Sequence, residues 1–179
     1  VEPGRVVADG WGATAEPGVW AIGDLTGAPM LAHRASHQAM ACVERIAGRR
    51  EGEPAPQAEI PSCVYAHPQT ASVGLTEDQA RAQGRAVRIG RFPLQASGKA
   101  IAIGEAAGFV KTLFDVDSGA LLGAHLVGAE APELIHGMAL GRTLEATEAE
   151  FIETVFPHPT MSEALHESVL AAFGRALHV

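Results

Sequence analysis

Five segments with the character of β-strands, joined by short connections, constrain the fold of this chain more than any other feature. They are rich in β-branched and aromatic residues and are bounded by Gly, Pro, Asp and Ser. Their sequences are SCVYA (62–66), TASVG (70–74), AVRIGRFPL (86–94), GFVKTLFDV (108–116) and ALLGAHLVG (120–128). The turn residues Asp-Ser-Gly join the last two, which indicates a hairpin.

Helical patterns lie between and after these segments. The expected helices are 76–83 with Thr76 as cap, about 130–141, about 147–153, and 161–173 ended by Gly174. Strands joined by short turns, with helices around them, are typical of an α+β domain on an antiparallel sheet. We therefore predict an antiparallel sheet with flanking helices over residues 61–179.

The first fifty residues have a different pattern. A helix is expected from Met30 to about Ala47, because apolar residues recur at helical spacing and Gly48 follows. Two short β-type runs, RVVA (5–8) and VWAI (19–22), precede it. A charged, proline-rich stretch then indicates a linker at 51–60. The chain has no initiator Met and opens in a strand-like run, which suggests that it begins within a longer protein.

Composition excludes several classes of function. The net charge is −8 with no basic run beyond Arg49-Arg50, so a nucleic-acid partner is not expected. No apolar run approaches the roughly 20 residues of a membrane span, and the N-terminus lacks the features of a signal peptide. Cys42 and Cys63 lie too far apart in sequence for a CxxC pair, so we expect buried free thiols in a reducing compartment, the cytoplasm.

The stretch FPHPTMSEAL (156–165) places a histidine between two prolines. Pro159 restricts His158 to extended conformations and Pro157 stiffens the backbone before it. Thr160 and Glu163 form a T-x-x-E pattern, which predicts a helix cap and explains Glu163 structurally. Alternatively, Glu163 accepts a hydrogen bond from His158, which would fix its tautomer and raise the basicity of the other ring nitrogen. Spacing alone does not separate these interpretations.

A second candidate site follows the apolar run that ends in Gly23-Asp24. A carboxylate at the carboxyl end of a sheet is a common ligand-binding position, although on the residues alone a local turn explains Asp24 better. The segment Met30, Leu31, Ala32 and His33 opens the helix, whose first N–H groups have no intrahelical partner.

Three other patterns are set aside. His33 and His37 have the spacing of a zinc pair, but the sequence offers no third ligand, so we expect no metal site. His67 also precedes a proline, but Ser72 stands where a carboxylate would be needed, so we interpret it as structural. The segment ASGKA (96–100) lacks the pattern of a phosphate-binding loop.

Three long blocks carry a resemblance to a known family. They are VWAIGDLTGAPMLAHRASHQAMACVERIAG, IPSCVYAHPQTASVGLTEDQA and HPTMSEALHESVLAAFG. In this order they resemble the C-terminal part of the dihydrolipoamide dehydrogenases, which are flavin-linked pyridine nucleotide–disulfide oxidoreductases of the 2-oxo acid dehydrogenase complexes. The resemblance implies that His158 accepts a proton from the dithiol substrate in the partner subunit's active site, with Glu163 orienting it.

The resemblance also implies cofactors and partners. Asp24 would hold a ribityl hydroxyl of FAD, and residues 30–33 would lie at the flavin pyrimidine edge. Electrons would pass through a disulfide and FAD to NAD. The implied partners are a second subunit, giving a homodimer, and the lipoyl domains of a 2-oxo acid dehydrogenase complex. We expect β-type run 120–128 and helix 161–173 to contribute to the dimer interface.

The sequence contains no GxGxxG turn and no redox-active cysteine pair, both of which the family needs. We therefore expect a C-terminal fragment: the tail of an FAD-binding α/β domain at 1–50 and the dimerisation domain at 61–179. Such a fragment alone would be inactive and would not retain FAD or NAD. One departure is Phe156-Pro157, where the family commonly has His-Ala. The alternatives are another flavin disulfide reductase, such as a glutathione reductase, and an isolated dimerisation module without catalysis.

Overall fold

The structure, a computed structural model, describes residues 3–52 and 60–179. The chain divides into two compact units, Val1–Pro56 and Gln57–Val179. The predicted linker at 51–60 lies mostly outside the described residues. No helix within the described ranges is both long enough and apolar enough to cross a membrane.

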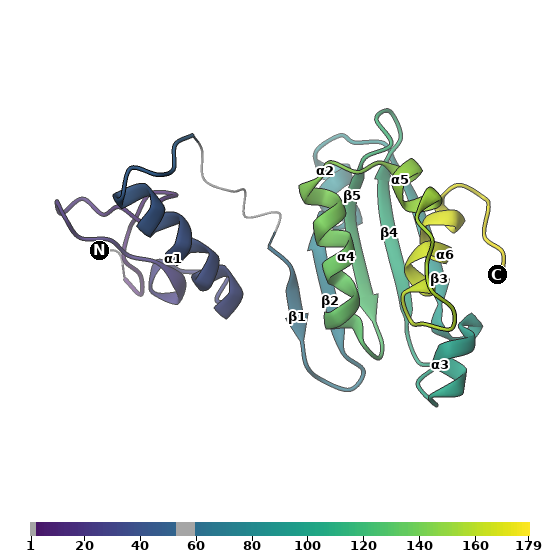
Figure 1. The fold of residues 1–179 in the computed structure, drawn as a ribbon. Coiled ribbons are helices and arrows are strands. Elements are labelled where there is room, and N and C mark those ends of the chain that lie inside the picture. Colours follow the sequence, from purple (N-terminus) through teal and green to yellow (C-terminus); the bar gives the residue numbers. More distant parts are fainter. Residues whose placement is uncertain (1–2, 53–59) are drawn as a thin grey trace. The chain divides into compact units, whose positions relative to one another are not determined.

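The second unit is built on a five-stranded sheet (Figure 1). Its spatial order is β1-β2-β5-β4-β3, and every neighbouring pair is antiparallel. The strands are β1 (Ser62–Val64), β2 (Thr70–Gly74), β3 (Val87–Pro93), β4 (Phe109–Asp115) and β5 (Leu121–Val127). Each of the five predicted segments contains one of these strands, so the predicted antiparallel sheet is confirmed.

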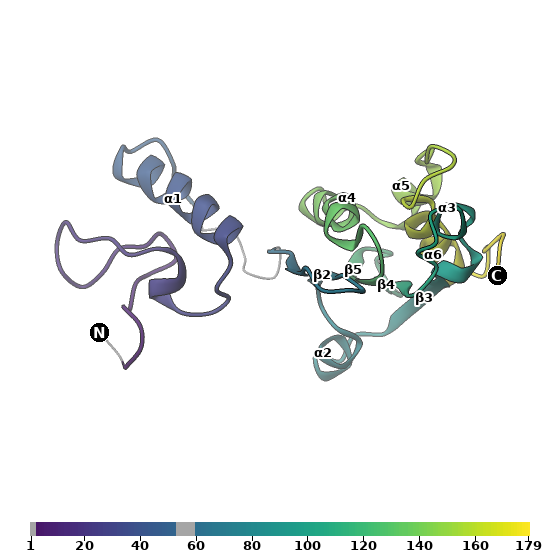
Figure 2. The same ribbon diagram turned by 90° about the horizontal axis from the view of Figure 1, so that it is seen from below.

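Helices cover the sheet unequally. Figure 2 shows α4, α5 and α6 on one side of the sheet and α2 on the other. The helices of this unit are α2 (Glu77–Ala82), α3 (Gly98–Ala102), α4 (Ala131–Thr143), α5 (Glu148–Glu153) and α6 (Glu163–Ala172). Four were predicted from sequence, and Thr76 caps α2 in a capping box with Gln79, as expected. The short helix α3 was not predicted; it begins in the ASGKA segment and Ser97 caps it.

Strand alternation divides the buried side chains between the two faces of the sheet. On β4, Val110 and Phe114 face the main core beneath α4 and α6, whereas Leu113 belongs to a smaller cluster with Ala80 of α2. Helix α6 lies directly against the sheet: a side chain at Gly90 of β3 would overlap the backbone of α6. This close contact fixes the position of the helix that carries Glu163.

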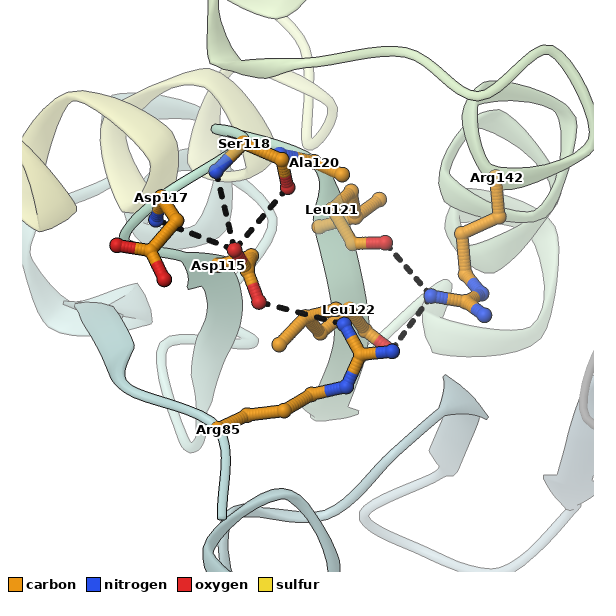
Figure 3. A network of polar contacts seen from close by, with 8 residues as sticks. All are labelled: Arg85, Asp115, Asp117, Ser118, Ala120, Leu121, Leu122 and Arg142. Carbon is orange, nitrogen blue, oxygen red and sulfur yellow. Dashed lines mark hydrogen bonds and ion pairs between the residues drawn. The ribbon is translucent and has the colours of Figure 1, made fainter. Parts of the chain in front are cut away.

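The hairpin between β4 and β5 is held by a network of polar contacts (Figure 3). One oxygen of Asp115 accepts hydrogen bonds from the N–H groups of Asp117 and Ser118 and from the Ser118 hydroxyl. The other oxygen pairs with Arg85 at 3.3 Å. Burial raises the pKa of Asp115, but the hydrogen bond from Ser118 is the largest influence and holds the pKa below its usual value.

Helix α4 is tied to the first residues of β5 by one guanidinium group. Arg142 Nη1 donates to the carbonyl oxygens of Leu121 and Leu122, each at 2.6 Å. Figure 3 shows this arginine reaching from α4 to the strand. Because a charged donor strengthens hydrogen bonds to carbonyl groups, these contacts fix α4 over the centre of the sheet.

The first unit contains η1 (Gly23–Thr26) and α1 (Ala32–Ile46). The predicted helix is confirmed, and Gly48 follows it in the left-handed conformation with φ 66°. The predicted strands at 5–8 and 19–22 are wrong. Within residues 3–52 the second run forms only a single bridge, Ala13 to Trp20, because no neighbouring strand is present to build a hydrogen-bonded ladder.

Candidate functional site

The loop before α6 is closed on itself by its own polar groups. The Thr160 hydroxyl donates to the carbonyl oxygen of Pro157 at 2.7 Å, and the Thr160 N–H donates to Glu163 Oε2 at 2.8 Å. The expected cap at Thr160 is wrong: α6 begins at Glu163, and Ser162 occupies the N-cap position. Because the Thr160 hydroxyl is engaged by Pro157 and by Ser162 Oγ, it is not directed at the N–H groups of the helix.

His158 and Glu163 meet in this loop. His158 Nδ1 lies 2.9 Å from Glu163 Oε1, and the other carboxylate oxygen, Oε2, accepts a hydrogen bond from the Thr160 N–H. The contact with the imidazole is therefore present, whereas of the predicted capping box only the hydrogen bond from the Thr160 N–H to Glu163 is formed. Glu163 bonds to the loop backbone, as in a capping box, and also contacts the imidazole.

The charge state of Glu163 decides where the proton on the ring lies. Burial raises the pKa of Glu163, but the Thr160 N–H, the hydrogen bond to His158, and the charges of His158 and His178 together lower it below its usual value. An ionised carboxylate only accepts hydrogen bonds, so Nδ1 is the protonated nitrogen. Nε2 is then free to accept a proton.

The imidazole is directed outward from a fixed support. The His158 side chain is 78% exposed, whereas that of Glu163 is 33% exposed. Phe156 stacks on His166 of α6, with ring centroids 4.9 Å apart and an interplanar angle of 15°. Phe156, which departs from the family pattern, thus attaches the start of the loop to α6. This arrangement suits an acid–base group that meets its reactant at the surface.

Asp24 occupies a different environment from the one expected. It lies in the 3-10 helix η1 instead of at the end of a strand, and its side chain is exposed. Two residues of α1 that the sequence analysis did not single out hold this loop. Buried Arg34 donates to the carbonyl oxygens of Gly27 and Pro29 at 2.7 and 2.9 Å, and Gln38 Oε1 accepts the Gly23 N–H at 2.9 Å.

The segment 30–33 spans the start of α1. Met30 precedes the helix, Leu31 is its N-cap residue, and Ala32 and His33 are its first two residues. Leu31 forms no side-chain hydrogen bond as a cap, so the first N–H groups are not capped in that way. An exposed carboxylate at Asp24 and these backbone donors fit a ligand that offers a hydroxyl and carbonyl oxygens.

The residues set aside earlier have these surroundings. His67 Nε2 lies 4.0 Å from Glu105 Oε2, so a carboxylate stands near it although Ser72 does not supply one. Both cysteines are free; Cys42 is buried as expected, but Cys63 is only partly buried. Burial raises the pKa of both thiols, with smaller contributions from nearby acidic residues. Across the described ranges, no group of three His, Cys, Asp or Glu side chains is arranged to hold a metal ion.

Comparison with known proteins gives a consistent result. Residues 60–169 match the family described as pyridine nucleotide-disulphide oxidoreductase, dimerisation domain. The chain is 61% identical over 178 residues to a dihydrolipoyl dehydrogenase of Zymomonas mobilis, covering 99% of this chain and 38% of that protein. It is 54% identical over 175 residues to a dihydrolipoyl dehydrogenase of Rhizobium etli, covering 98% of this chain and 36% of that protein.

Solved structures show the same similarity in fold. LpdA from Mycobacterium tuberculosis superposes with a TM-score of 0.86 at 26% identity, covering 92% of this chain and 36% of LpdA. The HOCl-induced flavoprotein disulfide reductase RclA from Escherichia coli gives a TM-score of 0.88 at 25% identity, covering 94% of this chain and 39% of RclA. The chain thus spans well under half the length of the proteins it matches.

Proposed function

The chain belongs to the pyridine nucleotide-disulphide oxidoreductase family, and from that membership we propose that it is the C-terminal part of a dihydrolipoyl dehydrogenase. In the intact enzyme it would supply the acid–base residue His158 and the dimerisation domain. The observation that carries the proposal is the contact of 2.9 Å between His158 and Glu163 on a closed loop. Identities of 61% and 54% to dihydrolipoyl dehydrogenases support the substrate class.

The chemistry of this chain is the movement of one proton. A free thiol such as that of cysteine, whose pKa is about 8.5, is mostly protonated at neutral pH, and the thiolate is the nucleophile. His158 Nε2 would take the proton from a dihydrolipoyl thiol, leaving a thiolate able to attack a disulfide outside this chain. The proton on Nδ1 stays hydrogen-bonded to Glu163, whose negative charge stabilises the imidazolium.

The first unit would contribute to cofactor binding. When bound, FAD would supply a two-electron acceptor between the dithiol formed by the exchange and NAD. The exposed Asp24 carboxylate would accept a hydrogen bond from a ribityl hydroxyl. The N–H groups at the start of α1, across residues 30–33, would donate to the pyrimidine carbonyls at the positive end of the helix dipole.

Assembly would complete the site. His158 is largely exposed in the protomer, although general-base catalysis is favoured where water is excluded. We propose a homodimer in which this residue serves the active site of the partner subunit, with the lipoyl domains of a 2-oxo acid dehydrogenase complex as the protein substrates. The match to a dimerisation domain supports the homodimer.

A second candidate function is that of another flavoprotein disulfide reductase. The similarity to RclA in fold favours it, because that protein shares both units at a TM-score of 0.88. The two functions differ in substrate. Oxidation of the dithiol dihydrolipoamide with NAD would support the first, and reduction of a disulfide other than lipoamide would support the second.

The test compares two histidines in the intact enzyme. We expect His158→Gln to reduce turnover of dihydrolipoamide by roughly 10²–10⁴-fold, the usual scale of general-base catalysis, while the flavin remains bound. His67→Gln is the matched control, because His67 also precedes a proline and lies near a carboxylate, at 4.0 Å. Full turnover of His158→Gln, or an equal loss in both variants, would contradict the proposed role.

A further inference from the structure

A second acidic residue of α6 holds the end of the chain. Glu167 is 5% exposed and lies one helical turn after Glu163. Its Oε2 accepts hydrogen bonds from the backbone N–H groups of Leu177 and His178, at 3.0 and 3.3 Å. Its Oε1 lies 2.9 Å from His178 Nδ1. Because an unpaired buried carboxylate is costly, these three contacts fix the last residues against the helix.

The two carboxylates of α6 stand on the same face. Residues four apart in a helix are neighbours, with Cβ atoms about 5–6 Å apart. Glu163 holds His158 from the preceding loop, and Glu167 holds His178 from the C-terminal segment. The result is a row of two imidazoles and two carboxylates, which we call the α6 charge row: His158, Glu163, His178 and Glu167.

His178 is linked to Glu163 through Glu167, which lies one helical turn after Glu163. Burial raises the pKa of Glu163, and the charge of His178 is among the influences that lower it, after those of Thr160 and His158. The ionisable groups facing Glu163 are thus His158 from the loop, His178 from the C-terminal segment and Glu167 from the same helix. His166, on α6 too, instead contacts the carbonyl oxygen of Ile152.

We propose that His178 is a positioning residue for the His158–Glu163 pair, acting through the buried carboxylate of Glu167 one helical turn from Glu163. This inference rests on the proposed function for its catalytic meaning. The positive charges of protonated His178 and protonated His158 both interact with the Glu163 carboxylate.

The charge row can be tested on the 179-residue chain without substrate or flavin. The measurement is the titration of the Glu163 side-chain carboxyl by carbon-13 NMR, in the unmodified chain and in two variants. His178→Gln removes the charge but retains an amide that can donate to Glu167. It should shift the Glu163 titration to higher pH, because one neighbouring cation is lost. His178→Lys keeps a cation there and should restore the lower titration.

Two controls separate charge from structure. His136→Gln changes an exposed histidine on α4 and should leave the Glu163 titration unchanged. The shift caused by His178→Gln should also shrink between about 0.1 and 1 M salt, since the Debye length falls from about 10 to 3 Å. Amide exchange at Leu177 reports whether the C-terminal segment stays on α6.

Two results would overturn the proposal. One is a Glu163 titration in His178→Gln equal to that of the unmodified chain. The other is an equal, salt-independent shift in His178→Gln and His178→Lys, which would mean that His178 only anchors the chain end. Neither result depends on catalysis. If His158→Gln kept full turnover in the intact enzyme, the proposed function would fail while the charge row could still be observed.

Discussion

At the scale of single residues, Glu163 connects the backbone of the loop to the imidazole. Its two oxygens have different partners, Thr160 N–H and His158 Nδ1, so the loop conformation and the ring orientation depend on one carboxylate. Replacing it therefore affects stability and proton transfer together. The effect on stability and the effect on proton transfer can be distinguished by how each depends on pH.

The first prediction concerns acid stability. The pKa of Glu163 is below its usual 4.5 in the folded chain, despite the opposing effect of burial. Such a carboxylate stabilises the fold fully above the unfolded pKa, and this contribution is lost as pH falls through the folded pKa. Urea unfolding between pH 7 and 3 should therefore show a shallower loss of stability in Glu163→Gln than in the unmodified chain.

The matched control for this prediction is Glu153→Gln, at the exposed end of α5. It should reproduce the slope of the unmodified chain. An identical acid slope in Glu163→Gln would mean that the ionised carboxylate adds nothing to the stability of the fold.

Glu163→Gln should also lose less turnover than His158→Gln in the intact enzyme, because the base itself is still present.

The sequence offered the His158–Glu163 contact as one of two interpretations, which the family resemblance favoured, but it gave no sign of the residues behind Glu163. His158 and Glu163 are five positions apart in a stretch confined by two prolines, so their approach follows from local geometry. Glu167 and His178 are eleven positions apart, and the chain reverses between them near Gly174, at φ 67°. Nothing in their spacing indicates contact, because it depends on where the chain end packs.

At the scale of elements, the site depends on how α6 lies on the sheet. Thr112 of β4 and Ser168 of α6 are both fully buried, and their hydroxyl oxygens are 3.0 Å apart. Thr112 Oγ1 also lies 3.2 Å from the Ser168 carbonyl oxygen. These polar contacts sit within an apolar core and specify one position of the helix.

The second prediction is a coupling between these residues. Thr112→Val should cost about 1–3 kcal/mol of unfolding free energy, because it leaves the Ser168 hydroxyl buried without this partner. The double variant Thr112→Val with Ser168→Ala should cost less than the sum of the single variants, by about 0.5–3 kcal/mol. Chemical denaturation measures all four proteins. Strictly additive effects would show that the contact contributes nothing.

The elements themselves were predictable where their partners lie close by in the same chain. All five strands between 62 and 127 find antiparallel neighbours within that range, so composition and turns were sufficient. The runs at 5–8 and 19–22 have strand composition too, but strand formation requires a partner that composition does not reveal. Helix α3 was missed because ASGKA was considered only as a phosphate-binding loop.

At the scale of the whole molecule, assembly is the property least visible in a single protomer. The expected interface segments, β5 and α6, direct most of their apolar side chains into the core of the protomer. Large apolar side chains that remain exposed in the second unit include Tyr65, Leu144 and Val155, at 78, 70 and 91%. Val155 lies three residues before His158.

The third prediction is that the chain forms a homodimer through a surface that includes Val155. Burying this exposed side chain in the partner would favour association, and a charge there would oppose it. Sedimentation at micromolar concentration should show dimer for the unmodified chain and weaker association for Val155→Asp. Val7→Asp, in the first unit, is the control. A monomeric unmodified chain would contradict the prediction.

The central claim is that His158 removes the proton from the dithiol, and the pH dependence of flavin reduction by dihydrolipoamide tests it most directly. In the intact enzyme, the loss of rate caused by His158→Gln should be largest below the pKa of the substrate dithiol, and it should narrow at alkaline pH, where thiolate forms without a base. This result would confirm His158 as the base. A deficit that stays constant across the pH range, or no deficit, would contradict the account.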